Sequence, residues 1–566
     1  MKATALLIVF LLCKALVLAG RHIDFTPWAI AAYVWQDCLV VLLFAGIESV
    51  VGKKIGWTLY VVAVLWATLN VPVARMMSTP LTWPMLHAAG GPLLDSIKHQ
   101  ATAGNILSML LIAVVAAIAP IFFKRIRWGL VVALAVVVVS GALAANHVET
   151  MGRERNAFVV LLTSSFARVE AKEASADWRR SLIAQPQDEE PLPYTGISRG
   201  KNVLIIILES AGARYLKPYG AAEDPMPTIT SLSQHAILFE NASTVYPESI
   251  KGLMATLCSR YLAIDVAAER YANVRTPSVA DVLKQSGYRT GLFHSGRFMY
   301  LGMRELLTNR GFEALEDAGD IGGNRESSFG IDESATVHRT LNWIDQDKTR
   351  PFFAVYMPIA GHHPYETPSP GPYPEKEEID RYRNALHYAD LSVAELIDGL
   401  RSRNLLDQTV LILFGDHGEA FGQHDGNFGH TNFIYQENLH VPFVIIAPGI
   451  DHPIRVNRPV SLIDVPGTIC DLLGLDPPKI WQGGSALRDQ GMSLFLTDYS
   501  LGLLGLRDGQ WKFIYQLENG RTRLFDLQAD PLETTDLSAQ HATRSQLYCD
   551  HLLKWSAAQR YSVLHP

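Results

Sequence analysis

The 566-residue chain divides by hydrophobicity into an apolar N-terminal quarter and a longer part of mixed polarity. A helix needs about 20 consecutive apolar residues to cross a bilayer. Runs of roughly that length cover 3–20, 28–50, 56–74, 105–123 and 127–145. The pattern therefore predicts a transmembrane region of five helices over residues 1–145.

Basic residues predict how these segments are oriented. If the five segments alternate in direction, one side of the membrane receives Lys2, Lys53, Lys54, Lys124, Arg125 and Arg127. By the positive-inside rule that side is cytoplasmic. We therefore expect a multi-pass inner (plasma) membrane protein whose residues after 145 are extracytoplasmic (periplasmic). The alternative, a cleaved signal peptide over residues 1–20, lacks a clear small-x-small cleavage site.

Two carboxylates, Asp37 and Glu48, fall in or near the second apolar segment. Carboxylates inside a membrane are costly and often functional. Glu48 lies close to Lys53 and to the expected interface, so its side chain can reach water by snorkelling. Asp37 could face a neighbouring helix or a lipid headgroup, and both interpretations stay open.

Polarity changes after the last apolar segment. Residues 146–200 are predicted to be a juxtamembrane connector, amphipathic over 157–169 and a polar, proline-containing linker over 185–193. From residue 201 onward short apolar strands alternate with helical patterns, which predicts an α/β fold with a mostly parallel sheet sandwiched by helices. The expected strands are Val203–Leu208, Thr290–Phe293, Phe352–Tyr356, Thr409–Phe414 and Pro442–Ile446, and the helices between them include Ser278–Ser286, Glu333–Asp345 and Arg381–Arg401.

The C-terminal part of this predicted 201–566 domain has a different pattern. Apolar strands at 511–515 and 522–527 flank an Asn-Gly turn, which predicts a hairpin within residues 505–535. We expect a small antiparallel sheet there, packed beside the main sheet, and a helical tail over 534–560.

Charge and cysteine content exclude some functions. A net charge of -7 and the absence of a basic stripe argue against nucleic-acid binding. There is no Cys-x-x-Cys pair among the five cysteines, so a structural zinc cluster is not expected. One disulfide among Cys258, Cys470 and Cys549 remains possible.

Polar residues follow four of the expected strands: Glu209-Ser210, His294-Ser295, His362-His363-Pro364 and Asp416-His417. In open α/β sheets ligands bind beyond the carboxyl ends of the strands. Glu209, Asp416 and His417 offer carboxylate oxygens and an imidazole nitrogen, a set that suits zinc or manganese better than calcium. The alternative for Glu209 is a carboxylate stabilised by a helix N-terminus.

The segment Asn241–Tyr261 is similar to the nucleophile segment of the sulfatase and alkaline-phosphatase-like superfamily, which precedes a helix. The resemblance implies that Ser249 is the nucleophile, with Ser243, Thr244 and Thr256 as competitors. Sulfatases read Cys-or-Ser-x-Pro-x-Arg here, and the first residue becomes formylglycine. This chain has Lys251 and Leu253 in place of the proline and arginine, so we expect a plain serine. Ser249 could also serve as a helix N-cap.

The resemblance continues along residues 200–535. Gly361–Tyr365 is similar to the family's His-x-Pro substrate loop, and 506–515 and 524–533 resemble its C-terminal sheet subdomain. His430 stands where sulfatases carry a lysine that contacts the sulfate and related phosphotransferases carry a histidine. The resemblance thus implies substrate contacts for His363 and His430; otherwise each is an ordinary surface or core histidine.

Five spans followed by such a domain resemble lipoteichoic acid synthases and phosphoethanolamine transferases. This implies an alkaline-phosphatase-like fold and a phosphoryl-headgroup transferase, with a divalent metal held by Glu209, Ser249, Asp416 and His417. Ser249 would attack a phospholipid donor, and His363 and His430 would hold phosphate oxygens or protonate the leaving alcohol. The acceptor would be an extracytoplasmic glycan or lipid. The alternatives are a membrane-anchored sulfatase or phosphodiesterase, and a non-catalytic sensor or scaffold.

Overall fold

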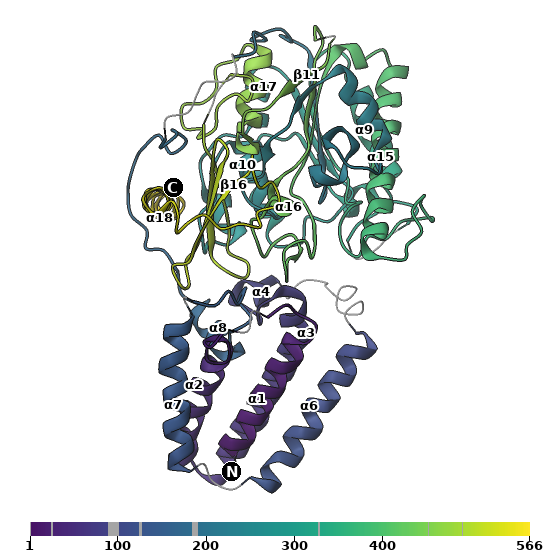
Figure 1. Cartoon of the computed structure of the whole chain (residues 1–566). Coiled ribbons are helices and arrows are strands. Elements are labelled where there is room, and N and C mark those ends of the chain that lie inside the picture. The colour runs from purple at the N-terminus through teal and green to yellow at the C-terminus, as the bar shows by residue number, and fades with distance from the viewer. Residues whose placement is uncertain are drawn as a thin grey trace.

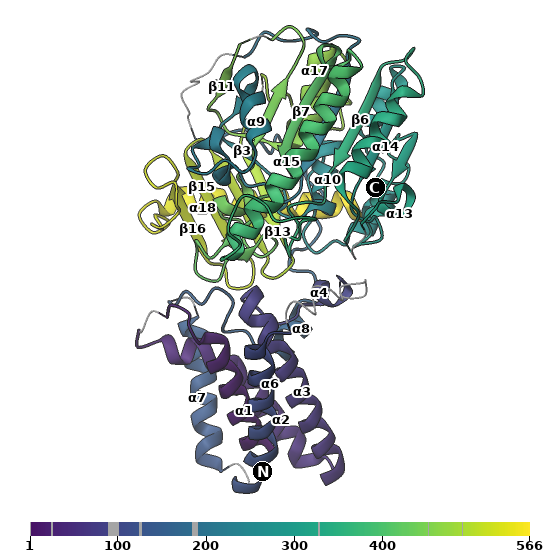
Figure 2. The same ribbon diagram turned by 90° about the vertical axis from the view of Figure 1, so that its right-hand side faces the viewer.

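The computed structural model places a bundle of long helices beneath a larger α/β domain (Figures 1 and 2). It describes residues 2–23, 26–88, 101–123, 127–145, 147–183, 191–325, 329–450, 452–488 and 491–566. The basic residues Lys124 and Arg125, and most of the predicted linker at 185–193, lie outside these ranges.

Long helices occupy all of the predicted apolar segments: α1 (Lys2–Leu18), α2 (Ala29–Val50), α3 (Lys53–Met77), α6 (Ala103–Phe122) and α7 (Trp128–Ala144). Within the described residues three of them, α2, α3 and α6, are long and apolar enough to cross a membrane. Helices α1 and α7 have 17 residues each. The structure thus supports three candidate membrane spans, and the set of five stays a prediction.

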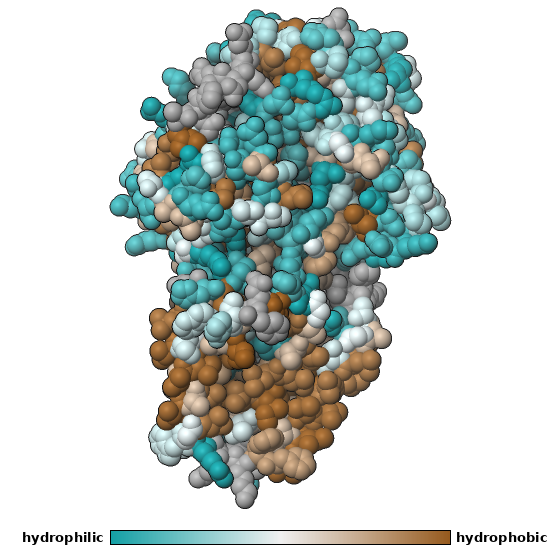
Figure 3. All heavy atoms as spheres, viewed as in Figure 1, coloured by the Kyte–Doolittle hydropathy of each residue, from teal (hydrophilic) through white to brown (hydrophobic). Residues whose placement is uncertain are grey.

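The surface of the bundle is apolar. Figure 3 shows hydrophobic residues gathered over the bundle and hydrophilic residues over the α/β domain. Large apolar side chains that a soluble protein would bury are exposed here, among them Val50 at 82% and Trp128 at 84%. An apolar outer surface on helices of this length is what a lipid environment requires.

Polar side chains inside the bundle pair with one another. Lys14 Nζ on α1 lies 3.3 Å from Asp37 Oδ2 on α2. The same ammonium donates to the carbonyl oxygens of Arg153 and Arg155 at 2.8 and 3.2 Å, and Asn156 donates to Asp37 Oδ1 at 2.7 Å. Asp37 therefore faces neighbouring protein, and it links α1 and α2 to the chain that leads into the α/β domain.

The end of the bundle far from the α/β domain carries a second ion pair. Lys2 Nζ lies 3.0 Å from Glu48 Oε1, and the Glu48 carboxylate also accepts the N–H of Ala3 at 3.1 Å. Glu48 thus pairs with Lys2 of α1 at this end of the bundle. Short helices α4 (Trp83–Ala88) and α8 (Ala157–Thr163) lie at the other end, facing the α/β domain (Figure 1).

The α/β domain is built on an eight-stranded sheet in the order β11-β2-β10-β7-β1-β6-β4-β5. Its strands are β1 (Asn202–Leu208), β2 (Ile237–Phe239), β4 (Arg289–His294), β5 (Ala314–Glu316), β6 (Phe352–Met357), β7 (Thr409–Gly415), β10 (Phe443–Ile446) and β11 (Ile454–Val456). All of the predicted strands are present. Strand β10 runs antiparallel to both neighbours, β7 and β2, so the sheet is mixed.

Helices cover both faces of the sheet because its central strand is apolar on both sides. On one face Val203, Ile205 and Ile207 of β1 share a core cluster with α10 (Ser249–Cys258), α11 (Val279–Gln285) and α17 (Val465–Leu473). On the other face Leu204, Ile206 and Leu208 pack with α9 (Pro227–Leu232), α14 (Glu333–Asp345) and α15 (Glu378–Ser402) (Figure 2). Unbroken apolar sequence in β1 therefore reflects burial of both faces.

A second, antiparallel sheet lies beside the first. It contains β13 (Ser493–Thr497), β14 (Leu503–Asp508), β15 (Trp511–Gln516) and β16 (Thr522–Asp526), followed by α18 (Ala542–Leu564). The predicted hairpin is β15–β16, with Gly520 in the left-handed region at φ 72°.

The remaining short strands and α-helices are β3 (Ala242–Ser243), β8 (Ala420–Phe421), β9 (Phe428–Gly429), β12 (Val460–Ser461), α12 (Met303–Leu307), α13 (Ala318–Ile321) and α16 (Gln436–Leu439). All five cysteines are buried free thiols, so the possible disulfide is absent.

Removing one partner from each of the bundle's two ion pairs should reduce the folding stability by different amounts. Asp37→Ala should destabilise the protein by about 3–5 kcal/mol because it leaves the Lys14 ammonium buried without its counter-charge. Lys14→Met combined with Asp37→Leu should cost less than Asp37→Ala alone. The matched control, Glu48→Ala, removes the more exposed pair and should cost about 0–1 kcal/mol. Thermal unfolding in one detergent measures all three, and an Asp37→Ala midpoint as high as that of Glu48→Ala would contradict a structural role.

Candidate metal centre and catalytic pocket

The two central strands deliver the candidate ligands to one edge of the sheet. Strands β1 and β7 pair in parallel with Leu208 opposite Gly415, so Glu209 and Asp416 leave the sheet side by side. The N–H of Asp416 donates to the carbonyl oxygen of Leu208 at 3.1 Å. Asp416 Oδ1 in turn accepts the N–H of Ser210 at 2.9 Å, which fixes the carboxylate against the neighbouring strand end.

Two glycines allow the chain to pass closely on either side of Asp416-His417. A Cβ on Gly415 would lie 2.1 Å from the carbonyl oxygen of Ala211, and one on Gly418 would lie 2.1 Å from that of Glu437. Both obstacles are backbone atoms and cannot rotate away. The Gly-Asp-His-Gly sequence is therefore a packing requirement around the candidate ligands.

Ser249 begins helix α10, but it is not the N-cap. That position belongs to Glu248, whose carboxylate accepts the N–H groups of Ile250 and Lys251 at 2.8 and 3.1 Å. The N-cap alternative for Ser249 is thus wrong, and its hydroxyl is available for other contacts. Ser249 Oγ donates to Glu209 Oε2 at 3.0 Å and lies 3.3 Å from His417 Nε2.

The hydroxyl groups of the other nucleophile candidates do not contact the predicted metal ligands. Thr244 donates to the carbonyl oxygen of Tyr246, and Thr256 lies over the carbonyl oxygens of its own helix. Ser243 is buried in strand β3. Ser249 is the candidate nucleophile whose hydroxyl contacts the predicted ligands.

The donor set fits one small cation. His417 Nε2 lies 3.7 Å from Glu209 Oε1 and 3.5 Å from Asp416 Oδ2. Tetrahedral zinc with bonds near 2.0–2.1 Å would separate its ligands by about 3.3–3.4 Å. His417 Nδ1 contacts the carbonyl oxygen of Gly418 at 3.0 Å, which places the proton on Nδ1 and leaves Nε2 as the donor atom. The three side chains are buried and form a group that could hold a metal ion.

The electrostatics of this group also favour a cation. Burial, followed by the charge of the nearby Asp416 carboxylate, raises the pKa of Glu209 to about 8. Burial works to lower the pKa of His417, but the charges of Asp416 and Glu209 outweigh it and hold that pKa above its ordinary value. The neighbouring carboxylate charge contributes to both shifts, and a divalent cation would neutralise it.

His430 lies directly beside the metal-ligand group. Its ring stacks on that of His417 at 4.0 Å between centroids. Glu419 Oε2 lies 2.8 Å from His430 Nδ1, and Tyr365 donates to Glu419 Oε1 at 2.6 Å. His430 and Tyr365 outweigh burial and hold the pKa of Glu419 below its usual range. A charged carboxylate is therefore positioned to orient the His430 ring, whose role in substrate binding or proton transfer stays a prediction.

The two histidines of the 361–365 loop have different surroundings. His363 Nε2 lies 3.6 Å from Glu378 Oε1, and the side chain is 26% exposed. His362 is the one whose ring approaches His430, at 6.5 Å between centroids. Burial, followed by His430, lowers the pKa of His362 to about 3, so its imidazole is neutral. The sequence prediction chose His363 of this pair; the structure adds His362 as a candidate.

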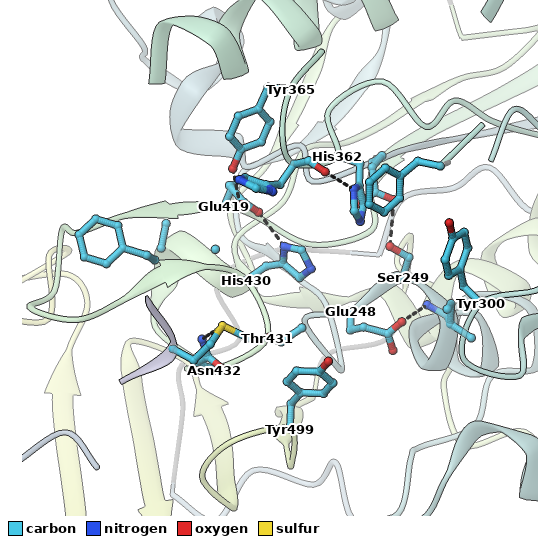
Figure 4. Close-up of a pocket in the computed structure, with 18 of the residues that line it drawn as sticks. Glu248, Ser249, Tyr300, His362, Tyr365, Glu419, His430, Thr431, Asn432 and Tyr499 are labelled. Atoms are coloured by element: carbon cyan, nitrogen blue, oxygen red, sulfur yellow. Dashed lines mark hydrogen bonds and ion pairs between the residues drawn. The ribbon is translucent and has the colours of Figure 1, made fainter. Parts of the chain in front are cut away.

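Glu209, Ser249 and His430 line one cavity of about 560 Å³, together with His362, His363, Tyr365 and Glu419. Figure 4 shows Ser249, His430 and Tyr499 around a common central space. His294, which follows β4, also lines the cavity, and its Nδ1 contacts the carbonyl oxygen of Met357 at 2.9 Å. The membrane bundle contributes the remaining wall through Arg21, Arg75, Met76 and Met77. Sequence analysis noted His294 as a strand-end residue but missed the contribution of the bundle.

Comparison with known proteins finds similarity to sulfatases and to lipoteichoic acid synthases. The sulfatase family model matches residues 201–475. Choline-sulfatase of Rhizobium meliloti (strain 1021) is 26% identical over 432 residues, 60% of this chain and 82% of that protein. Lipoteichoic acid synthase 2 of Bacillus subtilis (strain 168) is 22% identical over 311 residues, 52% of this chain and 48% of that protein. Among solved structures, the lipoteichoic acid synthase LtaP of Listeria monocytogenes superposes with a TM-score of 0.53 at 17% identity, covering 68% of this chain and 96% of that one.

The ligand group predicts which carboxylates bind metal. Glu209→Gln and Asp416→Asn should each lower the affinity for zinc or manganese by about tenfold or more, since each removes a charged donor. Glu378→Gln is the matched control, because Glu378 lines the cavity but pairs with His363 outside the group. Equilibrium dialysis with elemental analysis measures the bound metal. Equal metal binding by wild type and both ligand variants would remove the assignment.

The glycine next to the ligands predicts an indirect effect. Gly415→Ala should displace Asp416 and His417 and lower metal binding about as much as losing a ligand, although no donor atom is removed. Gly252→Ala, on α10 close to Ser249, is the control, since its Cβ would meet nothing nearer than 3.6 Å. Metal content and thermal midpoint are measured together. A Gly415→Ala protein with wild-type metal content would show that the local backbone can relax.

Proposed function

We propose that this chain, whose residues 201–475 match the sulfatase family model, is a membrane-anchored, metal-dependent phosphoryl-headgroup transferase of the sulfatase and alkaline-phosphatase-like superfamily. Its donor is a phospholipid, and its acceptor is a hydroxyl of an extracytoplasmic glycan or lipid. One observation supports this more than any other: the cavity that holds Ser249 is walled on one side by the helices that carry the apolar surface. A lipid in the same bilayer reaches such a cavity at high effective concentration.

The proposed reaction is a double displacement. Ser249 Oγ attacks the donor phosphorus, the bond from phosphorus to the diacylglycerol oxygen breaks, and the headgroup phosphate becomes attached to the serine. The hydroxyl proton leaves toward Glu209, which already accepts it in a hydrogen bond. His430 or His363 donates a proton to the leaving oxygen. The acceptor hydroxyl then attacks the same phosphorus and gives its proton to the histidine that protonated the first leaving group. Ser249 regains its proton from Glu209 as the Oγ–P bond breaks.

Glu209, Ser249, Asp416 and His417 are the proposed metal ligands. A bound zinc or manganese ion would lower the pKa of the serine hydroxyl and stabilise charge on the phosphoryl oxygens. The residues around the metal have separate tasks. His417 presents Nε2 because Gly418 holds its other nitrogen, and Glu419 orients His430 toward the cavity.

We also propose that all five long helices span the inner membrane, with the α/β domain on the extracytoplasmic (periplasmic) side. The Lys2–Glu48 pair and the start of α3 at Lys53 lie at the end of the bundle away from that domain. Positive charge at that end supports a cytoplasmic location for it.

The second candidate is a sulfatase or phosphodiesterase that passes the group to water, and the match to choline-sulfatase favours it. The Ser249 segment argues against a sulfatase, because Lys251 and Leu253 replace the proline and arginine of the formylglycine sequence. Lys251 is also committed elsewhere, with its Nζ 2.9 Å from the buried carboxylate of Asp498.

Labelling of the nucleophile tests the proposal. The full-length protein in detergent should acquire a headgroup-phosphate mass on Ser249 after incubation with headgroup-labelled phospholipid, and Ser249→Ala should lose both the adduct and turnover. Ser243→Ala, which alters the neighbouring buried serine, should keep both. Intact mass spectrometry measures the adduct. A formylglycine at position 249, or label found only as free headgroup in the presence of an acceptor, would favour the hydrolase.

A further inference from the structure

We propose that Asn438 is a positioning residue of the catalytic site, and that its side chain holds the His430 backbone where the His430 ring stacks on His417. Asn438 lies in α16 and is 0% exposed, so it can affect catalysis only through the residues that it contacts. This inference rests on the proposed function, in which His430 binds a phosphate oxygen or protonates the leaving oxygen.

The two stacked histidines come from different segments of the chain. His417 follows β7, and His430 follows β9. Strands β8 and β9 join these segments in a short antiparallel ladder with Ala420 opposite Gly429. The ladder ends one residue before His430, so the place of the His430 ring, 4.0 Å from that of His417 between centroids, depends on further contacts.

Asn438 contacts both of these segments. Its backbone carbonyl oxygen accepts the N–H of Gly418 at 2.9 Å. Its side-chain Nδ2 lies 3.1 Å from the carbonyl oxygen of Gly429 and 3.4 Å from that of His430. One residue thus binds the chain directly after His417 and the chain at His430. We infer that it sets the separation of the two histidine segments.

The neighbouring Asn427 determines which way the Asn438 amide points. Asn427 Nδ2 donates to Asn438 Oδ1 at 2.7 Å and to Glu437 Oε1 at 2.9 Å. Backbone carbonyl oxygens only accept hydrogen bonds, so the part of the Asn438 amide that faces Gly429 and His430 is its NH2 group. A side chain without N–H donors at this position would leave both carbonyl oxygens without this partner.

Helix α16 is itself held by the C-terminal sheet. The carboxylate of Glu533 accepts the N–H of Gln436, the first residue of α16, at 2.6 Å. Its other oxygen lies 2.6 Å from the Lys512 ammonium of β15, and both side chains of this pair are fully buried. A positioning residue is effective only when its own place is fixed. These contacts fix the helix that carries Asn438.

Glu419 and Asn438 act on different parts of His430. Glu419 Oε2 lies 2.8 Å from ring Nδ1 and so sets the rotation of the ring (Figure 4). The Asn438 amide binds at the backbone and so sets where the ring starts. Residues that orient a catalytic group without touching the substrate often change activity by about 10–100-fold when they are replaced.

The rate of Ser249 adduct formation tests the assignment in the full-length protein in detergent. Asn438→Leu has a side chain of similar size without N–H donors, and it should slow adduct formation at least about tenfold. Metal content should match that of wild type, because the contact to Gly418 is made by backbone. In a His430→Ala background Asn438→Leu should have little further effect, since its action passes through His430. Asn438→Ala, which forces no new atom into the core, gives the same comparison if the leucine variant does not fold.

Asn384→Leu is the matched control. Asn384 of α15 is also buried, at 2% exposed, and its amide binds both the N–H and the carbonyl oxygen of Tyr373. Asn384→Leu should lower the thermal midpoint as Asn438→Leu does but leave the adduct rate unchanged. Equal slowing by Asn384→Leu overturns the inference, as does a full additional loss from Asn438→Leu in the His430→Ala background. Both results would indicate a general loss of stability.

Hydrogen exchange separates this inference from the proposed function, because it needs no substrate. In Asn438→Leu the amides of residues 427–431 should exchange at least about tenfold faster than in wild type, and those around Tyr373 should not change. Asn384→Leu should show the reverse. Unchanged exchange over 427–431 overturns the inference. If wild type forms no Ser249 adduct, the proposed function has failed, and the exchange rates still decide whether Asn438 holds the His430 segment.

Discussion

The parallel pairing of β1 with β7 is the constraint on which the site depends. One register places Leu208 opposite Gly415 and so brings Glu209 and Asp416 to adjacent strand ends. A slip of one residue would point one carboxylate to the other face of the sheet. The register is held by six consecutive buried apolar residues in β1 and five in β7, packed on both faces. Core packing therefore sets the geometry of the ligand group before any metal or substrate is present.

A second set of interactions attaches this domain to the bundle. Arg153 pairs with Asp425 at 2.7 Å, and Ser78 donates to the carbonyl oxygen of Gly426 at 2.8 Å. These contacts join the ends of the membrane helices to the loop between β8 and β9. The same loop leads to His430, so the docking surface and the catalytic cavity are built from one stretch of chain.

The sequence predicted those features that local patterns determine. Glu209 and Asp416-His417 directly follow uninterrupted apolar runs, so their place at strand ends could be read from the chain. The direction of β10 could not be, because an apolar run of four residues has the same pattern whether the chain enters the sheet parallel or antiparallel. The sequence also could not predict that His362, and not His363, approaches His430. The two residues are adjacent in an irregular loop, so the loop conformation alone decides where each side chain points. Arg21 and Arg75 were missed since each reads as the polar end of an apolar helix, and their approach to the cavity depends on contacts between distant parts of the chain.

The shared wall of the cavity has a consequence for how this protein can be divided. Soluble domains with this fold are often treated as modules that can be joined to any anchor. Here part of the wall comes from Met76 and Met77 at the end of α3, so cutting between bundle and domain would open the cavity to solvent. A substitution at the end of α3 therefore alters the shape of this cavity as directly as one beside Ser249.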